Sequence, residues 1–518
     1  MQSTEPYIVK SNNRFIHFAV AFCAGALLTI AFSPFDFILA LPFAFIILLV
    51  LLDNVQRSKF WTGFCFGYGH FLTSLYWITY SILDHFREFL WVIPFVLVLL
   101  PFCMSLFIGI VAVLADRFKQ HRVLYVISFA TIWVIGEIIR SYLVLPFPWN
   151  LLGYTASSSI YLAQIASIVG VHFLSWIMCI FATSIYSKNK TFISCTLVAL
   201  ISIYCYGYWR VNNQNVLKVL PYKIYAVQPN FKGTSDVAQK YNNLRQLLNL
   251  SQTALTNDPI MGDFSKKSAD IIVWPEAALP FGVYDNSDLY LALATILPKN
   301  GYLITGVDRI EATSDTMKFY NSIIVLNNIG DIKGVYDKRI LVPFGEYIPF
   351  RHVLPNLIQK VVPGLADFSH GNKTETLTIG DTIGDASLKV LPLVCYESIF
   401  PYLISSYDLK DVALLLNLTN NNWFGESMGP HHHFMMTRMR AIEFGISTLI
   451  VSNTGPSAMI DPMGRLVQTT EINSQATFLS QIPTPSLSFY AQCKYCPLYL
   501  LVVIVFGMLM SRQIILRA

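Results

Sequence analysis

The amino-acid sequence predicts an α-helical membrane bundle that carries a separate α/β domain. Three observations lead to this prediction. The 518 residues are 54% hydrophobic and only 13% charged, whereas a soluble globular protein is about 25% charged. Apolar runs long enough to cross a bilayer fill residues 1–210 and recur once near the C-terminus. Between them, short β-branched runs alternate with helical patterns, which is typical of layered α/β packing.

The apolar runs predict about eight transmembrane helices. Their approximate ranges are 15–33, 36–52, 60–81, 89–115, 122–140, 161–187, 191–209 and 494–511. No small-residue cleavage site follows the first run cleanly, so we interpret it as a retained helix and not a signal peptide. The chain is therefore divided into a seven-helix membrane domain (1–210), a soluble domain (211–490) and a final helix with its tail (491–518).

Basic residues predict the orientation of these helices, because cytoplasmic loops are enriched in Lys and Arg. If the N-terminus is cytoplasmic, the short outside loops hold only Arg87 and Arg140. The inside segments then hold Lys10, Arg14, Arg57, Lys59, Arg117, Lys119, Arg122, Lys188, Lys190, Arg512 and Arg517. Both termini are therefore expected in the cytoplasm, with the soluble domain on the opposite face. Glu137 and Arg140 either pair, face a cavity, or mark a helix end at the interface.

The soluble domain shows strand and helix patterns in alternation. Strands are expected at 223–227, 270–274, 302–307, 322–326, 332–336, 388–394, 413–418, 448–452 and 458–460, and helices at 235–256, 286–298 and 434–445. Residues 327–331 and 461–464 carry hairpin-turn chemistry. Segment 343–372 is interrupted by prolines with apolar residues between them. It is either a lid or membrane-dipping arm beside a site, or an ordinary surface loop.

Composition also bears on partners and cofactors. The net charge of +5 is diffuse and does not indicate nucleic-acid binding. Six of the nine cysteines lie in apolar runs of the first 205 residues, where they are small hydrophobes and not a disulfide framework or a zinc motif. No cofactor is expected. The histidines at 431–433 do not predict a metal, because no carboxylate completes a site. Cys493 and Cys496 form a CxxC pair without thioredoxin-like context.

Three residues could form a cysteine-nucleophile acyl-transfer site. Cys395 follows the strand-like run 388–394, Glu276 follows Trp274-Pro275, and Lys338 follows the 332–336 strand. A thiol attacks a carbonyl as the thiolate, so a base such as Glu276 is needed, and an amine can stabilise the oxyanion that forms. Taken one at a time, such residues are more often a buried strand cysteine, a helix-cap neighbour and a surface charge.

Family resemblance decides between these interpretations. The runs Trp-Pro-Glu-Ala-Ala, Tyr-Asp-Lys-Arg-Ile-Leu-Val-Pro-Phe-Gly-Glu-Tyr-Ile-Pro and Val-Cys-Tyr-Glu-Ser resemble the three motifs of the nitrilase (carbon–nitrogen hydrolase) superfamily. Together with residues 419–425, residues 438–443 and the arrangement of apolar runs, they resemble the apolipoprotein N-acyltransferases over essentially the whole chain. The resemblance implies a nitrilase-like α-β-β-α sandwich for the soluble domain.

The resemblance also implies site residues. Glu276 would be the general base, Lys338 the oxyanion stabiliser and Cys395 the nucleophile. Supporting or substrate-binding roles would fall to Glu346, Tyr396, Glu397, Asn420 and Trp423, with Asn321 a weaker candidate. Glu397 would either hold Lys338 in place or cap a helix, and Trp423 would either line the site or belong to the core.

The implied reaction is ping-pong acyl transfer from a membrane phospholipid to the α-amine of a diacylglyceryl-modified apolipoprotein. The partners would be these two substrates and the surrounding membrane lipids. The enzyme would lie in the bacterial inner membrane with its catalytic domain in the periplasm. Two alternatives remain: a membrane-tethered amidase acting on a small amide, and a transporter or receptor with a vestigial triad.

Overall fold

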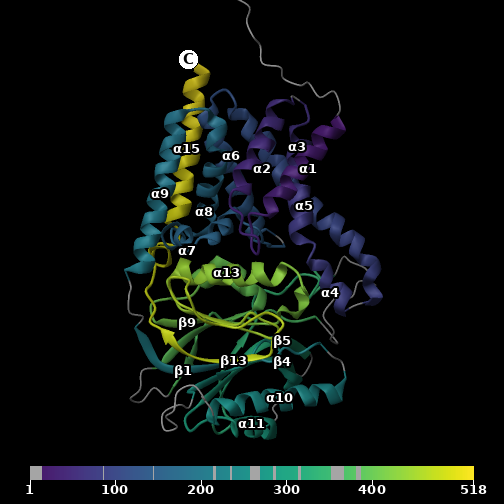
Figure 1. Cartoon of the computed structure of the whole chain (residues 1–518). Helices are drawn as coiled ribbons and strands as arrows, with labels where there is room; N and C mark the ends of the chain where they lie inside the picture. Colours follow the sequence, from purple (N-terminus) through teal and green to yellow (C-terminus); the bar gives the residue numbers. More distant parts are fainter. Residues whose placement is uncertain are drawn as a thin grey trace, which may run out of the picture.

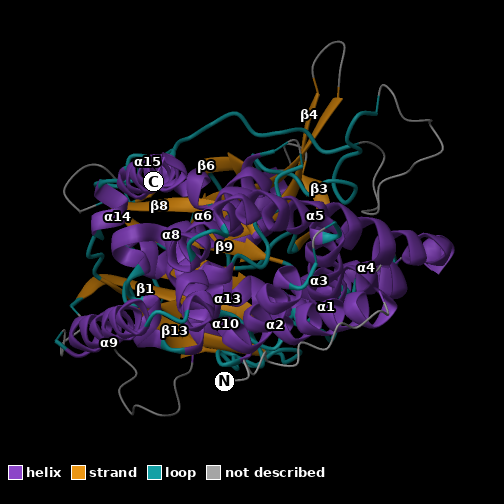
Figure 2. Ribbon diagram, turned by 90° about the horizontal axis from the view of Figure 1, so that it is seen from above, coloured by secondary structure: helices purple, strands orange, loops and turns teal. Residues whose placement is uncertain are grey.

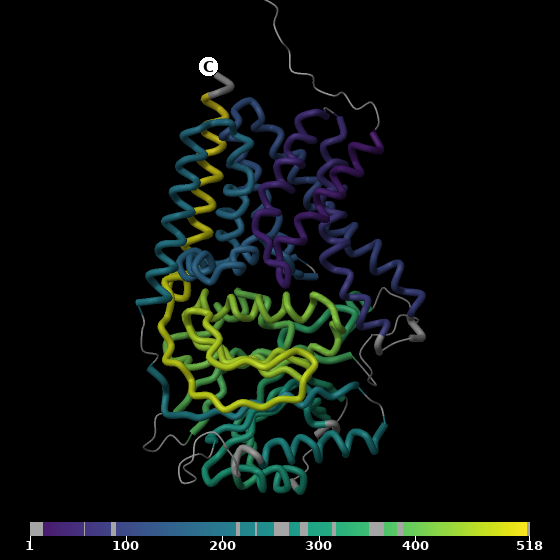
Figure 3. The backbone as a smooth tube through the Cα atoms, viewed as in Figure 1, coloured from purple at the N-terminus to yellow at the C-terminus, as the bar shows by residue number. Residues whose placement is uncertain are grey.

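The computed structural model describes residues 14–517 apart from 56, 86, 144, 214–217, 234–235, 257–268, 284–286, 313–316, 352–366 and 381–386. A bundle of helices stands on a sandwich of two β-sheets (Figure 1). Seen from above, the helices lie over the sheets (Figure 2). The first residues of α1 and the last of α15 lie at the end of the bundle far from the sheets (Figure 3).

The bundle contains a helix at each of the eight predicted apolar runs. These are α1 (Arg14–Thr29), α2 (Ala40–Asp53), α3 (Lys59–Leu75), α5 (Ile93–Ala115), α6 (Arg122–Tyr142), α8 (Ala166–Thr183), α9 (Lys190–Asn212) and α15 (Cys496–Arg517). Within the described ranges, five helical stretches are long and apolar enough to cross a membrane, and α1 and α2 are shorter apolar helices. Several helices can therefore span a bilayer, whereas the count of eight stays a prediction.

Two predicted runs are wrong as single helices. The run 60–81 stops at Leu75, and a separate α4 (Ile78–His85) follows. The run 161–187 divides into α7 (Ile160–Ala163) and α8, and α8 itself breaks at Gly170, which has φ 70°. A Cβ at Gly170 would lie 2.5 Å from the Tyr490 ring, so this position combines a left-handed backbone with close packing.

Two mixed sheets form the soluble domain. One has the strand order β13-β1-β2-β4-β5-β6, with β3 paired to β4, and the other has the order β12-β11-β10-β9-β8-β7. The strands are β1 (Val219–Gln228), β2 (Ile271–Val273), β3 (Leu279–Val283), β4 (Tyr302–Ala312), β5 (Met317–Asn327), β6 (Ile332–Asp337), β7 (Leu377–Ile379), β8 (Leu388–Val394), β9 (Val412–Thr419), β10 (Thr448–Ser452), β11 (Ala458–Ile460), β12 (Leu466–Thr469) and β13 (Ala476–Pro483).

Nine of these strands overlap the predicted ones, and both predicted hairpin turns join antiparallel neighbours, β5 to β6 and β11 to β12. The strands β3, β7, β12 and β13 were not predicted. The strand directions matter for function. In the first sheet β2 runs parallel to β4, and in the second β8, β9 and β10 are mutually parallel. Residues that follow parallel strands meet at one edge of a sheet.

The layers are helix, sheet, sheet, helix, as expected (Figure 1). α10 (Val237–Thr256) and α11 (Ser287–Ala294) cover the first sheet through a core that includes Trp274 and Leu247. A second core, with Ile224 and Leu416 among its members, fills the space between the sheets. α12 (Pro401–Ser405), α13 (Gly429–Phe444) and α14 (Phe489–Gln492) contribute to a separate apolar cluster with Leu393 of β8 and Leu415 of β9, on the outer side of the second sheet.

α13 also forms the boundary with the bundle. The largest hydrophobic cluster contains Met435 and Phe444 of α13 together with residues of α2, α6 and α8. The bundle and the soluble domain are thus joined by a continuous apolar core. α13 begins at Gly429, earlier than the predicted start at 434. Pro430 is tolerated in its first turn because the backbone N–H groups there make no intrahelical hydrogen bond, so the missing N–H of proline costs nothing. The histidines at 431–433 are therefore helical.

Candidate active site

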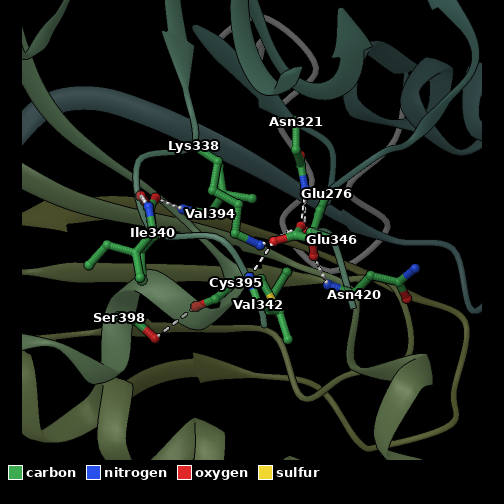
Figure 4. Close-up of polar contacts among 12 residues, drawn as sticks. Glu276, Asn321, Lys338, Ile340, Val342, Glu346, Val394, Cys395, Ser398 and Asn420 are labelled. Carbon is green, nitrogen blue, oxygen red and sulfur yellow. Dashed lines mark hydrogen bonds and ion pairs between the residues drawn. The ribbon is translucent and has the colours of Figure 1, made fainter. Parts of the chain in front are cut away.

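Strand ends bring the three predicted catalytic residues together. Glu276 lies shortly after β2, Lys338 directly after β6 and Cys395 directly after β8. The side chains of Glu276, Lys338 and Glu346 converge, and Cys395 lies beside them (Figure 4). All are buried: Lys338 is 1% exposed, and Glu276 and Cys395 are each 7% exposed. The charged groups therefore interact in an environment that screens them weakly.

Lys338 is held by two carboxylates. Its Nζ lies 2.8 Å from Glu346 Oε1 and 3.6 Å from Glu276 Oε1. Burial works against the charge on Lys338, but Glu346 and Glu276 outweigh it and raise the pKa of the amine above its ordinary value. Lys338 is thus a permanent cation, as an oxyanion stabiliser must be. Glu346 Oε2 also accepts a hydrogen bond from the Val342 N–H, 2.8 Å away.

Glu276 is a buried carboxylate with fixed partners. Its Oε1 accepts from Asn321 Nδ2 and its Oε2 from the Asn420 N–H, each 2.8 Å away. Burial raises the pKa of Glu276 above its ordinary value, with Lys338 acting in the opposite direction. A raised carboxyl pKa makes a stronger base, which suits removal of a thiol proton.

Cys395 has a backbone conformation unusual for its residue type. Its φ is 49°, in the left-handed region, immediately after β8 and at the start of the 3₁₀-helix η5 (Cys395–Ile399). Such strain is held only where surrounding contacts enforce it. Burial and then the charge of Glu276 raise the pKa of the thiol to about 12, against the effects of Lys338 and a hydrogen bond from Thr419. The resting thiol is therefore protonated and needs a base.

Glu397 fixes the backbone around Lys338. Its carboxylate accepts hydrogen bonds from the Arg339 N–H (2.7 Å), the Ile340 N–H (3.1 Å) and the Tyr336 hydroxyl (2.9 Å). It also accepts from the Val394 N–H at 2.8 Å, which caps η5. Glu397 therefore binds the backbone that directly follows Lys338 and also caps η5, and its role toward Lys338 stays a prediction.

Three other supporting candidates are Asn321, Asn420 and Trp423. Asn321 is more central than the sequence indicated, because its Nδ2 bridges Glu276 and Glu346 Oε1, the latter at 3.1 Å. Asn420 contacts Glu276 through its backbone, while its side chain accepts from the Asn422 N–H in η6 (Asn421–Phe424). Trp423 lies on η6 and its carbonyl accepts from Ser81 of α4.

Sequence reasoning missed contacts to the main chain of Cys395. His433 Nε2 lies 3.0 Å from the Cys395 carbonyl oxygen, and His433 Nδ1 lies 3.0 Å from Asn421 Oδ1. Ser398 Oγ lies 3.2 Å from the same carbonyl. The run of histidines is the one signal in the sequence, and by itself it suggests a metal site more readily than a contact to a backbone carbonyl. Within the described part of the chain, no group of three His, Cys, Asp or Glu side chains is arranged to hold a metal ion.

Three further sequence features can now be placed. Glu137 and Arg140 are buried and line one small cavity of the bundle. Each binds the following loop: Glu137 Oε1 accepts from the Leu152 N–H, and Arg140 donates to the carbonyls of Phe147 and Trp149. Cys493 and Cys496 form a disulfide at the start of α15. Of the proline-rich segment 343–372, the part from 352 to 366 lies outside the described residues.

Comparison with known proteins gives concordant results. Residues 24–184 match the apolipoprotein N-acyltransferase N-terminal domain, and residues 223–492 match the carbon-nitrogen hydrolase family. Among solved structures, the chain is similar to Nit3 of Saccharomyces cerevisiae, a member of branch 10 of the nitrilase superfamily. That match has 18% identity and a TM-score of 0.36, and it covers 54% of this chain and 94% of Nit3.

Whole-chain relatives are also found. The apolipoprotein N-acyltransferase of Rickettsia typhi is 34% identical over 489 residues, which cover 90% of this chain and 93% of the relative. That of Rhizobium rhizogenes is 33% identical over 486 residues, with 88% of each chain covered. Because these matches extend over both the membrane bundle and the soluble domain, the chain belongs to the apolipoprotein N-acyltransferase family.

Proposed function

We propose that the protein transfers a fatty acyl chain from a membrane phospholipid to the α-amine of the diacylglyceryl-modified N-terminal cysteine of apolipoproteins. The observation that carries the proposal is the family match over both parts of the chain, joined to a buried cluster of Glu276, Lys338 and Cys395. A carboxylate, a fixed cation and a thiol suffice for acyl transfer without a cofactor.

In the first half-reaction, Glu276 takes the thiol proton and Cys395 Sγ attacks the ester carbonyl of the phospholipid. Lys338 and the N–H of Tyr396 stabilise the oxyanion. When the tetrahedral intermediate collapses, the ester C–O bond breaks and the departing glycerol oxygen receives the proton from Glu276. The products are a lysophospholipid and a thioester on Cys395.

In the second half-reaction, the α-amine of the lipoprotein attacks the thioester carbonyl. Glu276 removes a proton from the amine, the C–S bond breaks, and the thiolate of Cys395 recovers that proton. The product carries a new amide. In this scheme Glu346 holds Lys338, and Asn321 holds Glu276. Glu397 holds the segment that carries Lys338. The segments that border the site carry Tyr396, Asn420 and Trp423.

The architecture suits substrates that are anchored in a bilayer. Drawing an acyl chain into water costs about 0.8 kcal/mol per CH₂, so a site next to the membrane surface avoids a large penalty. We place eight spans in the bacterial inner membrane, divide the chain at 210 and 490, and assign the catalytic domain to the periplasm and both termini to the cytoplasm. The charge distribution along the sequence supports this topology.

Mass spectrometry of a synthetic lipopeptide tests the proposal. The peptide carries an S-diacylglyceryl N-terminal cysteine and is incubated with the full-length protein and phosphatidylethanolamine, beside a Cys395→Ala variant. We expect the wild type to add one fatty-acyl mass to the amine and the variant to add none. An equal gain with both proteins would overturn the assignment of Cys395. No gain with either, together with hydrolysis of a soluble amide, would favour the amidase alternative.

A further inference from the structure

His433 lies against the main chain of the nucleophile. It is carried by α13, on the outer side of the second sheet, and is 1% exposed. Its Nε2 lies 3.0 Å from the Cys395 carbonyl oxygen and 3.1 Å from Ser398 Oγ, and its Nδ1 lies 3.0 Å from Asn421 Oδ1. The mechanism above gives this residue no role.

The surrounding hydroxyl groups show which donor the Cys395 carbonyl depends on. The Thr437 hydroxyl donates to the His433 carbonyl at 2.9 Å, so its oxygen is left to accept. Ser398 Oγ is 2.7 Å from the Thr437 hydroxyl oxygen but 3.2 Å from the Cys395 carbonyl oxygen. A serine has one proton to donate, and the shorter contact takes it. Nε2–H of His433 is therefore the remaining donor to the Cys395 carbonyl.

The other ring nitrogen, Nδ1, also faces an acceptor. Asn421 Nδ2 donates to the Gly455 carbonyl at 3.0 Å, which fixes the direction of the amide and makes Asn421 Oδ1 the acceptor at Nδ1. Burial lowers the pKa of His433 to about 4, so the ring carries a single proton at neutral pH. That proton can serve only one ring nitrogen. On Nε2 it serves two acceptors, the Cys395 carbonyl and Ser398 Oγ, whereas on Nδ1 it would serve only Asn421 Oδ1, which favours the Nε2–H tautomer.

The ring is also held from the membrane side. Trp149, from the loop after α6, lies nearly parallel to His433, with an interplanar angle of 12°. Phe424 of η6 meets the same ring edge-on at 66°. The Trp149 carbonyl is in turn bound by Arg140. The orientation of His433 therefore depends on contacts from both the soluble domain and the bundle.

We propose that His433 is a positioning residue for the acyl-transfer reaction, holding the Cys395 carbonyl and thereby the whole Cys395–Tyr396 peptide. In a trans peptide the C=O and N–H groups point in opposite directions. A donor that fixes the carbonyl on the α13 side therefore fixes the Tyr396 N–H on the other side, where the scheme above places the oxyanion. The same bond helps to hold Cys395 at its strained φ of 49°. This inference rests on the proposed function.

The test uses three substitutions of His433, two that each reproduce one ring nitrogen and one that reproduces neither. His433→Gln places an amide donor near the position of Nε2, His433→Asn places one near Nδ1, and His433→Phe keeps the flat ring against Trp149 without any donor. His431→Gln is the matched control, because His431 is only half-buried and lies near Asp36. Each full-length variant is assayed in phospholipid micelles for kcat, for KM of the lipopeptide, and for single-turnover release of lysophospholipid.

We expect the Asn and Phe variants to lose roughly 10- to 100-fold in kcat and in lysophospholipid release, as when a reacting group is misplaced by a fraction of an ångström. KM should be unchanged, His433→Gln should recover most of the rate, and His431→Gln should match the wild type. Thermal unfolding of each variant reports whether it is folded. The rates of the Gln and Asn variants are compared at a temperature at which both proteins are folded.

Equal losses in the Gln and Asn variants, or a rise in KM with an unchanged kcat, would overturn the positioning role. The proposed function is tested separately in the same assay. If the wild type acylates the lipopeptide and Cys395→Ala does not, that function stands whatever the His433 variants do. If the wild type releases no lysophospholipid, the proposed function fails before His433 is considered.

Discussion

The hydroxyl of Tyr396 donates a hydrogen bond to the carbonyl of Pro146, 2.9 Å away and 250 residues earlier in the chain. Tyr396 immediately follows the candidate nucleophile, and Pro146 belongs to the loop after α6. The loop is itself held by Arg140, which donates to the carbonyls of Phe147 and Trp149. The peptide that contains Cys395 is therefore attached to the bundle by Tyr396 on one side and to α13 by His433 on the other.

Removing the Tyr396 hydroxyl should slow acyl transfer without unfolding the protein. A neutral hydrogen bond contributes about 0.5–1.5 kcal/mol, so Tyr396→Phe is expected to lower kcat by up to about tenfold. Steady-state transfer to the lipopeptide measures the effect. Tyr402→Phe is the control, because Tyr402 packs against Tyr142 and is half-buried. If both variants keep the full rate, the Pro146 contact does not position the nucleophile.

Asn321 should set the acid limb of the pH–rate profile. Glu276 acts as the carboxylate, so kcat/KM falls as the pH drops through its pKa. Burial raises that pKa, and the hydrogen bond from Asn321 lowers it. Asn321→Ala removes the lowering contribution, so the acid limb should move to higher pH. Asn327→Ala, at the last residue of β5 beside Asp331, should leave the limb in place. A shift to lower pH after Asn321→Ala would contradict Glu276 as the base.

Glu346→Gln should move the same limb in the opposite direction. The charge of Glu346 raises the pKa of Glu276, so its neutralisation lowers that pKa and displaces the acid limb to lower pH. Lys338 then has Glu276, now 3.6 Å away, as its remaining carboxylate, and a tighter pair would withdraw the base from the thiol. We expect kcat to fall by about 100-fold, the size of a general-base contribution. An unchanged limb would show that Glu346 and Glu276 are not electrostatically coupled.

The positions of the catalytic candidates were predictable because each follows a strand whose hydrophobic run is clear in the sequence. Cys395 follows β8, a run buried almost throughout, and Lys338 follows β6. The short strands β3 and β7 could not be predicted, because a strand of three to five residues is defined by its partner strand more than by its own residues. β13 pairs with β1, more than 240 residues away, and no local signal reports such a pairing.

The contacts of the site were harder to predict than its members. Motif resemblance named Glu276, Lys338 and Cys395, but not that the Asn321 amide joins two carboxylates. The sequence predicts that this helix begins at 434, which leaves His433 outside it, whereas α13 begins at Gly429. The partner of His433 is a backbone carbonyl, and main-chain acceptors leave no trace in side-chain patterns. Tertiary hydrogen bonds of this kind become visible only when the chain is folded.

A last prediction concerns the joint between α13 and the bundle. Arg440 and Glu443 are both fully buried and lie 3.0 Å apart, and Glu443 Oε1 also accepts from the Val171 N–H, next to the break in α8 at Gly170. Glu443→Gln keeps the shape and the acceptor but leaves the Arg440 charge unpaired. Breaking one side of a buried pair costs about 3–5 kcal/mol, so thermal unfolding in detergent should shift clearly downward.

The exposed Glu426 provides the matched control for this joint. Its Oε1 lies 3.4 Å from Asn473 Nδ2, and exposed polar contacts contribute little to stability. Glu426→Gln should therefore unfold with the wild type. Because α13 also carries His433, we expect Glu443→Gln to slow lysophospholipid release even at temperatures where the protein remains folded. A Glu443→Gln variant that unfolds with the control and keeps its rate would show that the pair neither stabilises the joint nor orients α13.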